Sequence, residues 1–172
     1  AAFPSHVKML APAGRRIHTL LVNGCECEPY LSCDHRVMLE QTDALLRGIR
    51  IVLRATGAAR ALIGIEDDKP DALAAIRARL TPDDPISLQL VQTRYPQGAE
   101  KMLINAITGR TVPAGSLPFE VGAIVSNVAT LYAIYEAIFL GKPLIDRVVT
   151  VGGAGIGHPC NLQVPLGTPV EY

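Results

Sequence analysis

The sequence contains no tryptophan, and aromatic residues make up only 5% of its 172 positions. Proteins that hold single-stranded nucleic acid stack bases on aromatic side chains, so this scarcity argues against such a surface. Net charge is also lacking, because 16 Lys and Arg residues balance 16 Asp and Glu residues. The chain therefore has no overall field to attract nucleic acid or an anionic membrane. Hydrophobic residues make up 49% of the chain, enough for the core of a globular domain.

Long apolar runs and targeting segments are missing as well. No stretch approaches the roughly 20 residues that span a bilayer, and the first residues do not resemble a signal peptide. The opening residues, AAFPSHVK, are typical of the interior of a protein. We therefore expect the chain to be a piece cut from a longer one.

The four cysteines lack the spacing of metal and redox sites. Cys25, Cys27 and Cys33 fall within nine residues, and Cys160 lies far away. Zinc sites use C-x₂₋₄-C pairs, ferredoxin clusters use C-x₂-C-x₂-C, and redox pairs use C-x-x-C, none of which occurs here. A bound metal and a nucleophilic Cys25 stay open as alternatives. The favoured interpretation is four small buried hydrophobes, no metal site, and a reducing compartment.

Hydrophobic periodicity predicts alternating strands and helices. Apolar segments predict strands over 17–23, 60–66, 86–92 and 122–126, the first with little alternation, and helical spacing predicts helices over 36–56, 68–80, 98–108 and 127–140. This pattern is typical of an α/β fold, a three-layer Rossmann-like domain with a mostly parallel sheet.

The character of the sequence changes after the last predicted helix. Residues 144–172 are rich in Gly and Pro, β-like and without helical period. We expect a first domain over 1–143 and, over 144–172, the incomplete start of a small β-rich module. The run GGAGIG at 152–157 is not a dinucleotide fingerprint, because no helix follows it.

Each predicted strand ends in polar residues. Asn23 and the acids Glu26 and Glu28 follow the first strand, and Ser126 and Asn127 follow the fourth. Ligands of parallel sheets bind at the carboxyl ends of the strands, so these side chains predict a site there. The carboxylates could accept hydrogen bonds from a ribose, an amide or a ring N–H. The alternative is a solvated loop with incidental acids.

The predicted helix over 98–108 adds a second weak signal. Gly98 and Glu100 lie at its start, where free N–H groups favour an anion or another acceptor.

Five motifs together resemble a known family. They are AAFPSHVK, NGCECEPY followed by DHR, IGIEDDKP, YPQGAEKMLINAITGR followed by VPAGSLP, and VSNVATLYAI. In this order and spacing they resemble the RnfC subunit of the Rnf ion-translocating electron-transport complex, over nearly the whole chain. RnfC is in turn similar to the NuoF-type flavin subunit of complex I.

The resemblance implies an FMN and NADH site at the strand ends. It places Glu28 near the nicotinamide and assigns no certain catalytic residue. Cys25 and Ala99 replace acidic residues of the complex I relatives. The cofactor-binding residues that it implies are Phe3, Lys8, Asn23, Glu26, Glu28, Gly98, Glu100, Ser126, Asn127 and Thr130.

The resemblance also implies a function for the longer protein. FMN would oxidise NADH and pass electrons to 4Fe-4S clusters outside these residues and to ferredoxin, coupled to ion translocation. The protein would sit peripherally on the cytoplasmic side of the bacterial inner membrane with the other Rnf subunits, and the tail from 144 would open a β-grasp module. The family's glycine loop would precede Ala1, so we expect this piece to bind FMN weakly or not at all. Alternatives are a PduS-like cobalamin reductase domain and a non-catalytic scaffold.

Overall fold

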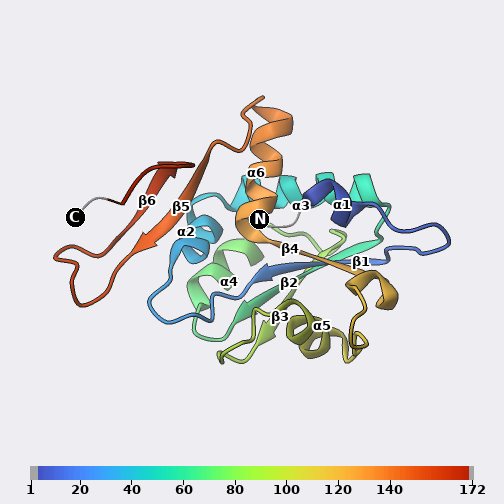
Figure 1. Cartoon of the computed structure of the whole chain (residues 1–172). Coiled ribbons are helices and arrows are strands. Elements are labelled where there is room, and N and C mark those ends of the chain that lie inside the picture. The colour runs from blue at the N-terminus through green and yellow to red at the C-terminus, as the bar shows by residue number, and fades with distance from the viewer. Residues whose placement is uncertain (1–3, 171–172) are drawn as a thin grey trace.

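The computed structural model describes residues 4–170 and centres on a four-stranded parallel sheet (Figure 1). The strand order is β3-β2-β1-β4. The strands are β1 (Thr19–Gly24), β2 (Arg60–Glu66), β3 (Ile86–Val91) and β4 (Ala123–Asn127). The sheet confirms the predicted α/β fold, and each predicted strand is present within two residues of its expected bounds.

The strand order reverses at β1, which pairs with β2 on one side and β4 on the other. Asn23, near the end of β1, lies between Gly64 of β2 and Asn127 of β4 in the sheet register. Open parallel sheets bind their ligands at the point where the strand order reverses. The topology therefore puts Asn23 and Asn127 side by side where a ligand is expected.

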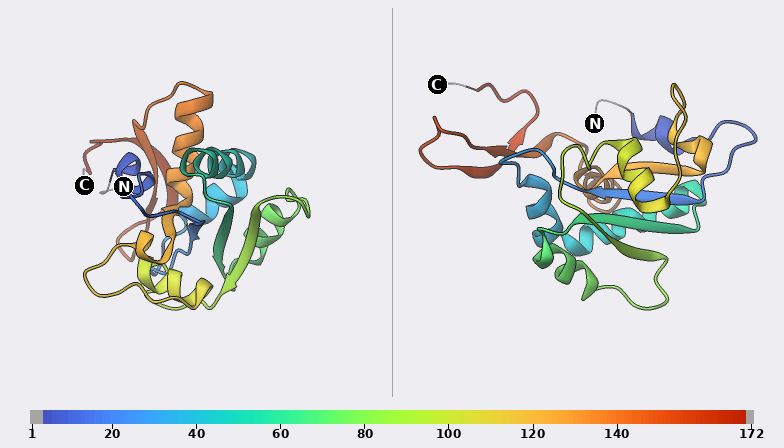
Figure 2. Two further views of the ribbon diagram at one scale, coloured as in Figure 1. Left: turned by 90° about the vertical axis from the view of Figure 1, so that its right-hand side faces the viewer. Right: turned by 90° about the horizontal axis from the view of Figure 1, so that it is seen from below.

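Helices cover both faces of the sheet, but unequally (Figure 2). One face packs against α2 (Cys33–Glu40), α3 (Thr42–Thr56), α4 (Pro70–Arg77) and α6 (Val128–Phe139). The other face packs against α5 (Glu100–Thr108). β1 is buried from both sides, since Leu20 belongs to the larger core and Leu21 to the smaller one. Two-sided burial explains why its sequence is continuously apolar.

The single helix predicted over 36–56 is wrong, because the structure has two helices there. Gln41 lies between α2 and α3 with φ −120° and ψ 28°, outside the helical region. The Thr42 hydroxyl donates a 2.6 Å hydrogen bond to the Met38 carbonyl, a bond that turns the backbone at this point. The predicted end of the helix is confirmed, since Gly57 terminates α3 with a positive φ of 69°.

Two short elements have no counterpart in the sequence prediction. They are α1 (Ser5–Met9) and the 3₁₀ helix η1 (Pro118–Val121), which lies in the Pro/Gly-rich segment before β4. Both are too short to show hydrophobic periodicity. They flank β4 and supply walls of the candidate site.

An antiparallel hairpin follows the sheet domain and confirms the β-like character of the tail. It consists of β5 (Asp146–Val151) and β6 (Cys160–Pro165), and it projects beside α2 (Figure 1). Ser32, just before α2, donates its backbone N–H to Thr150 and its hydroxyl to Asn161. Arg147 reaches across to the Ala129 carbonyl in the first turn of α6. The hairpin is therefore attached to the beginnings of two helices.

Within residues 4–170, no helix combines the length and the apolar character needed to cross a membrane.

Candidate functional site

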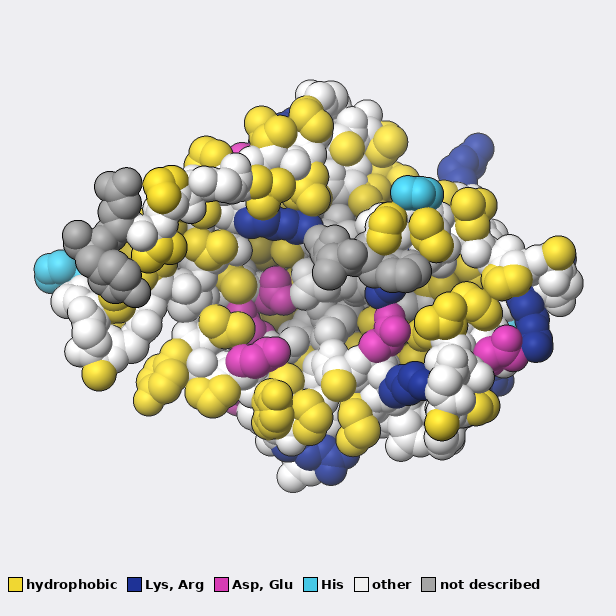
Figure 3. Space-filling view, in the orientation of Figure 1, with side chains coloured by type: hydrophobic (Ala, Val, Ile, Leu, Met, Phe, Trp, Pro, Cys, Tyr) yellow, Lys and Arg dark blue, Asp and Glu magenta, His cyan; other side chains and the backbone are white. Residues whose placement is uncertain are grey.

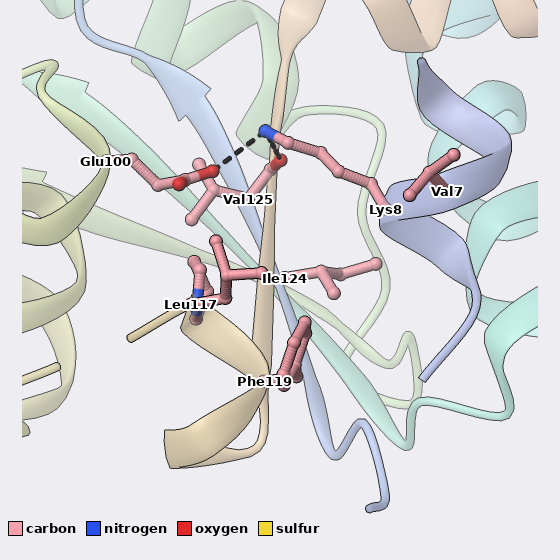
Figure 4. Close-up of a pocket in the computed structure, with 8 residues that line it drawn as sticks. Val7, Lys8, Glu100, Leu117, Phe119, Ile124 and Val125 are labelled. Atoms are coloured by element: carbon pink, nitrogen blue, oxygen red, sulfur yellow. Dashed lines mark hydrogen bonds and ion pairs between the residues drawn. The ribbon is translucent and has the colours of Figure 1, made fainter. Parts of the chain in front are cut away.

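Two neighbouring hollows lie along β4, beside the point where the strand order reverses. The larger, about 220 Å³, lies between α1, η1 and the start of α5 (Figure 4). The smaller, about 90 Å³, continues toward the start of α6. Both are lined by Lys8, Ile124 and Val125, so they form one crevice, here called the β4 crevice.

Lys8 is the cation of the β4 crevice. Its ammonium group donates to Glu100 at 2.8 Å and to the Val125 carbonyl at 2.9 Å (Figure 4). The other walls of the larger hollow are mostly apolar and come from Val7, Leu117, Pro118, Phe119 and Ile124. A half-exposed cation above apolar walls suits a ligand with a flat apolar body and an anionic group.

The smaller hollow has a polar end at the start of α6. Ser126, Asn127 and Thr130 line it. Asn127 caps α6, because its Oδ1 accepts the Ala129 N–H at 2.8 Å. The hollow thus combines hydroxyl groups, an amide and a helix N-terminus, which together suit hydroxyl and phosphate groups of a ligand.

Asn23 and Gly98 lie close together, as predicted for the site, but they bond to each other and do not line the crevice. The Asn23 side chain donates to the Gly98 carbonyl at 2.8 Å and accepts the Cys25 N–H at 3.0 Å. A Cβ on Gly98 would lie 3.1 Å from the Cys25 carbonyl oxygen, so the two loops pack closely there. This contact joins the loop after β1 to the loop before α5.

Glu26 is a buried helix cap in this structure. Its carboxylate accepts the N–H groups of Asp34 and His35 at the start of α2, at 3.0 and 3.2 Å. Glu28 is exposed on the following loop. In the space-filling view of Figure 3, acidic side chains lie in the middle of the face that is shown. Phe3 lies outside the described residues.

The sequence-predicted residues therefore divide into two groups. Lys8, Glu100, Ser126, Asn127 and Thr130 line the β4 crevice. Asn23, near the end of β1, and Glu26, Glu28 and Gly98 of the adjoining loops are absent from its walls.

Sequence reasoning missed two residues that organise these loops. Asp34, which is not among the predicted site residues, accepts a 2.5 Å hydrogen bond from Asn127 Nδ2. Glu66, fully buried at the end of β2, accepts the Glu26 N–H at 3.0 Å and pairs with Lys69. The contacts from Asp34 to Asn127 and from Glu66 to Glu26 join segments at least 40 residues apart. Local pattern alone could not have revealed them.

The cysteines are free, and residues 4–170 contain no group of three or more His, Cys, Asp and Glu side chains placed to hold a metal ion. Burial raises the pKa of the Cys25 thiol to about 12. Burial, together with the hydrogen bond to Glu26, raises the pKa of Cys33 to about 11. A raised pKa keeps a thiol protonated and a weak nucleophile. The expectation of a buried side chain is confirmed for Cys25 and wrong for Cys160, which is exposed, while Cys27 and Cys33 are half-buried.

These pKa shifts predict selective alkylation. At pH 8 we expect iodoacetamide to modify the exposed Cys160 first and Cys25 far more slowly, because Cys25 is buried and a pKa of about 12 leaves little of its thiol in the reactive thiolate form. Peptide mass spectrometry over a time course measures both rates. Unfolding in urea should abolish the difference. Rapid modification of Cys25 in the folded chain would contradict the burial assigned to it.

The sequence matches a known protein family, described as the Nuo51 FMN-binding domain, over residues 1–136. Curated relatives are named as C subunits of redox complexes. The protein from Clostridium ljungdahlii, the C subunit of a proton-translocating ferredoxin:NAD(+) oxidoreductase complex, is 46% identical over 98% of this chain. The Na(+)-translocating counterpart from Acetobacterium woodii is 39% identical over 99% of the chain. These similarities confirm the resemblance to RnfC.

The chain spans only part of these relatives. It covers 36% of the Clostridium protein, 39% of the Acetobacterium protein and 22% of the C subunit of an ion-translocating oxidoreductase complex from Pseudomonas aeruginosa, to which it is 45% identical. Among solved structures, an air-oxidised NAD+-reducing [NiFe]-hydrogenase superposes with a TM-score of 0.74 at 20% identity. The superposition covers 96% of this chain and 34% of the hydrogenase chain, and it confirms the fold.

Proposed function

The chain belongs to the Nuo51 FMN-binding domain family, and from this premise we propose that the β4 crevice is an FMN site. The observation that carries the proposal is the composition of the crevice. One ammonium group, Lys8, lies where the larger, apolar hollow meets the smaller one, which has a polar end at the start of α6.

The crevice walls fit the chemical parts of FMN. The apolar walls of the larger hollow suit the flavin ring system, and the hydroxyl and amide groups of the smaller hollow suit the ribityl chain. Lys8 and the first turn of α6 offer the positive potential that a phosphate requires. Glu100 already neutralises Lys8, so a bound phosphate would share the ammonium group with that carboxylate.

We further propose the role of the longer protein that the curated relatives indicate. Bound FMN would supply hydride acceptance from NADH and single-electron release toward iron–sulfur centres and ferredoxin. The protein residues would bind and orient the flavin, with Glu28 on the exposed loop near the nicotinamide. We place the protein peripherally at the cytoplasmic side of the membrane with the other members of the complex. We also propose that residues 1–143 form the flavin domain and that 144–172 begin a β-grasp module.

Replacing Lys8 with methionine tests the site. We expect K8M to weaken FMN binding tenfold or more, because losing a hydrogen bond to a charged group costs roughly 1.5–3 kcal/mol. Quenching of flavin fluorescence during titration measures the affinity. Riboflavin lacks the phosphate, so its affinity should change much less.

Lys101 provides the matched control. It is exposed in α5, donates to the Pro113 carbonyl and lies outside the crevice walls, so K101M should bind FMN like the parent. The titrations therefore use a longer chain that carries the family's glycine loop, and absence of saturable FMN binding by that chain up to millimolar flavin would reject the proposed site and favour a scaffold domain.

A further inference from the structure

Asp34 contacts the polar end of the β4 crevice without lining it. Its Oδ2 lies 2.5 Å from Asn127 Nδ2, and the two residues are 93 positions apart in the chain. Asn127 lines the smaller hollow, whereas Asp34 is absent from the walls of both hollows. Asp34 can therefore act on the hydrogen bonds of a ligand there only through its contact with Asn127.

The two contacts of Asn127 fix the direction of its amide. Its Oδ1 accepts the Ala129 N–H at 2.8 Å, and its Nδ2 donates to Asp34. Reversing the amide would place two donors against each other at Ala129. It would also place an oxygen against the Asp34 carboxylate. One remaining Nδ2 hydrogen is thereby left in a defined place for a ligand.

Charged groups surround Asp34. Glu26 faces it from the loop after β1 and also accepts its backbone N–H, while Arg147 faces it from β5 and Glu28 from the same loop as Glu26. Burial is the largest influence and raises the pKa of Asp34 to about 6, while the Asn127 hydrogen bond opposes that rise. Keeping an acid here costs stability near neutral pH, since the folded chain holds its proton more tightly than the unfolded chain.

We propose that Asp34 is a positioning residue that orients the Asn127 amide toward the ligand of the β4 crevice. This inference rests on the proposed function, because Asn127 is taken there as a flavin contact. Asp34 itself touches no ligand. Its acceptor oxygen matters, so an amide at position 34 can replace the carboxylate, whereas an apolar side chain cannot.

FMN titration of two variants tests this role. D34N keeps an acceptor for Asn127 and should bind FMN within about twofold of the parent. D34L removes the acceptor and should bind about fivefold or more weakly, the loss that corresponds to one hydrogen bond. Measurements well below the unfolding temperature separate binding from stability. Equal affinities of D34L and the parent, or equal weakening in D34N and D34L, would overturn the proposal.

A second readout needs no flavin. In ¹⁵N NMR spectra, the Asn127 side-chain amide should shift with pH with a midpoint near 6 in the parent and stay constant in D34N. N127S identifies the signal and keeps a capping side chain for α6. As pH rises from about 4 to 6, the contribution of Asp34 to the stability of the parent should fall, and the melting temperature of D34N relative to the parent should therefore be higher at pH 8 than at pH 4.

The two readouts distinguish the two ways in which these proposals can fail. If the parent binds no FMN but the Asn127 amide titrates, the flavin site is rejected and the orientation of Asn127 by Asp34 stands. If FMN binds and D34L binds it as tightly as the parent, the flavin site stands and the role of Asp34 is rejected.

Discussion

Replacing Lys69 with methionine is expected to destabilise the chain by about 3–5 kcal/mol, which lowers the melting temperature by about 10 °C or more. Lys69 Nζ lies 2.9 Å from Glu66 Oε2, and the Glu66 side chain has no exposed surface. Without the ammonium group, Glu66 becomes an unpaired charge in the core. Because Glu66 also accepts the Glu26 N–H, the loop after β1 loses part of its support. Thermal unfolding followed by circular dichroism measures the change.

A double substitution separates the buried charge from other effects of the mutation. E66Q/K69M carries no charge at either position, and the amide oxygen introduced at position 66 can still accept the Glu26 N–H. We expect it to regain more than half of the lost stability. The exposed variant K101M should change the melting temperature little. If E66Q/K69M were no more stable than K69M, the unpaired charge would not be the cause.

The second large effect is expected at Gly48, where α3 crosses α6. A Cβ at this position would lie 2.0 Å from the Leu131 carbonyl oxygen and 2.8 Å from its carbonyl carbon. G48A must therefore push two packed helices apart, and we expect a loss of about 3 kcal/mol and about 6–12 °C. Helix propensity alone would make G48A more stable than the parent, because Ala is favoured over Gly by about 1 kcal/mol in a helix interior. The sign of the change therefore decides whether the helices are this close.

Gly57 provides the comparison within the same segment. It ends α3 with a φ of 69° and has no atom within 4 Å of an added Cβ. G57A should cost about 1 kcal/mol through backbone strain alone, clearly less than G48A. Urea unfolding at 25 °C resolves a difference of this size. Equal losses in both variants would contradict a clash between the helices.

Periodicity was sufficient to predict the sheet, because its strands carry apolar runs that pack into the two cores. β2 is the clearest case, as the apolar run at 60–66 coincides with Arg60–Glu66. The break at Gln41 was not predictable, since the apolar spacing continues across it and the hydroxyl bond from Thr42 that accompanies it leaves no periodic signal. Hydrophobic periodicity indicates which face of a helix is buried, but it does not show where one helix ends and the next begins in a new direction.

The site could be predicted in part for a related reason. Parallel strand ends meet at one edge, so polar residues at those ends had to lie near one another, as Asn23 and Asn127 do. The sequence could not tell which side chains would point into a hollow and which would support the loops. Glu26 looked like a ligand contact, yet its carboxylate caps α2. Asp34 was not among the predicted site residues, yet its carboxylate accepts a hydrogen bond from Asn127.

The attachment of the hairpin makes Cys160 a convenient reporter position. Cys160 is exposed, while the next residue, Asn161, faces inward and donates to the Ser32 hydroxyl at 3.0 Å. A dye or spin label on this thiol would therefore sit on a hairpin that hydrogen bonds hold against the start of α2. Spectroscopic distances from the label to a molecule bound in the β4 crevice would therefore depend more on the position of that molecule than on movement of the β5–β6 hairpin.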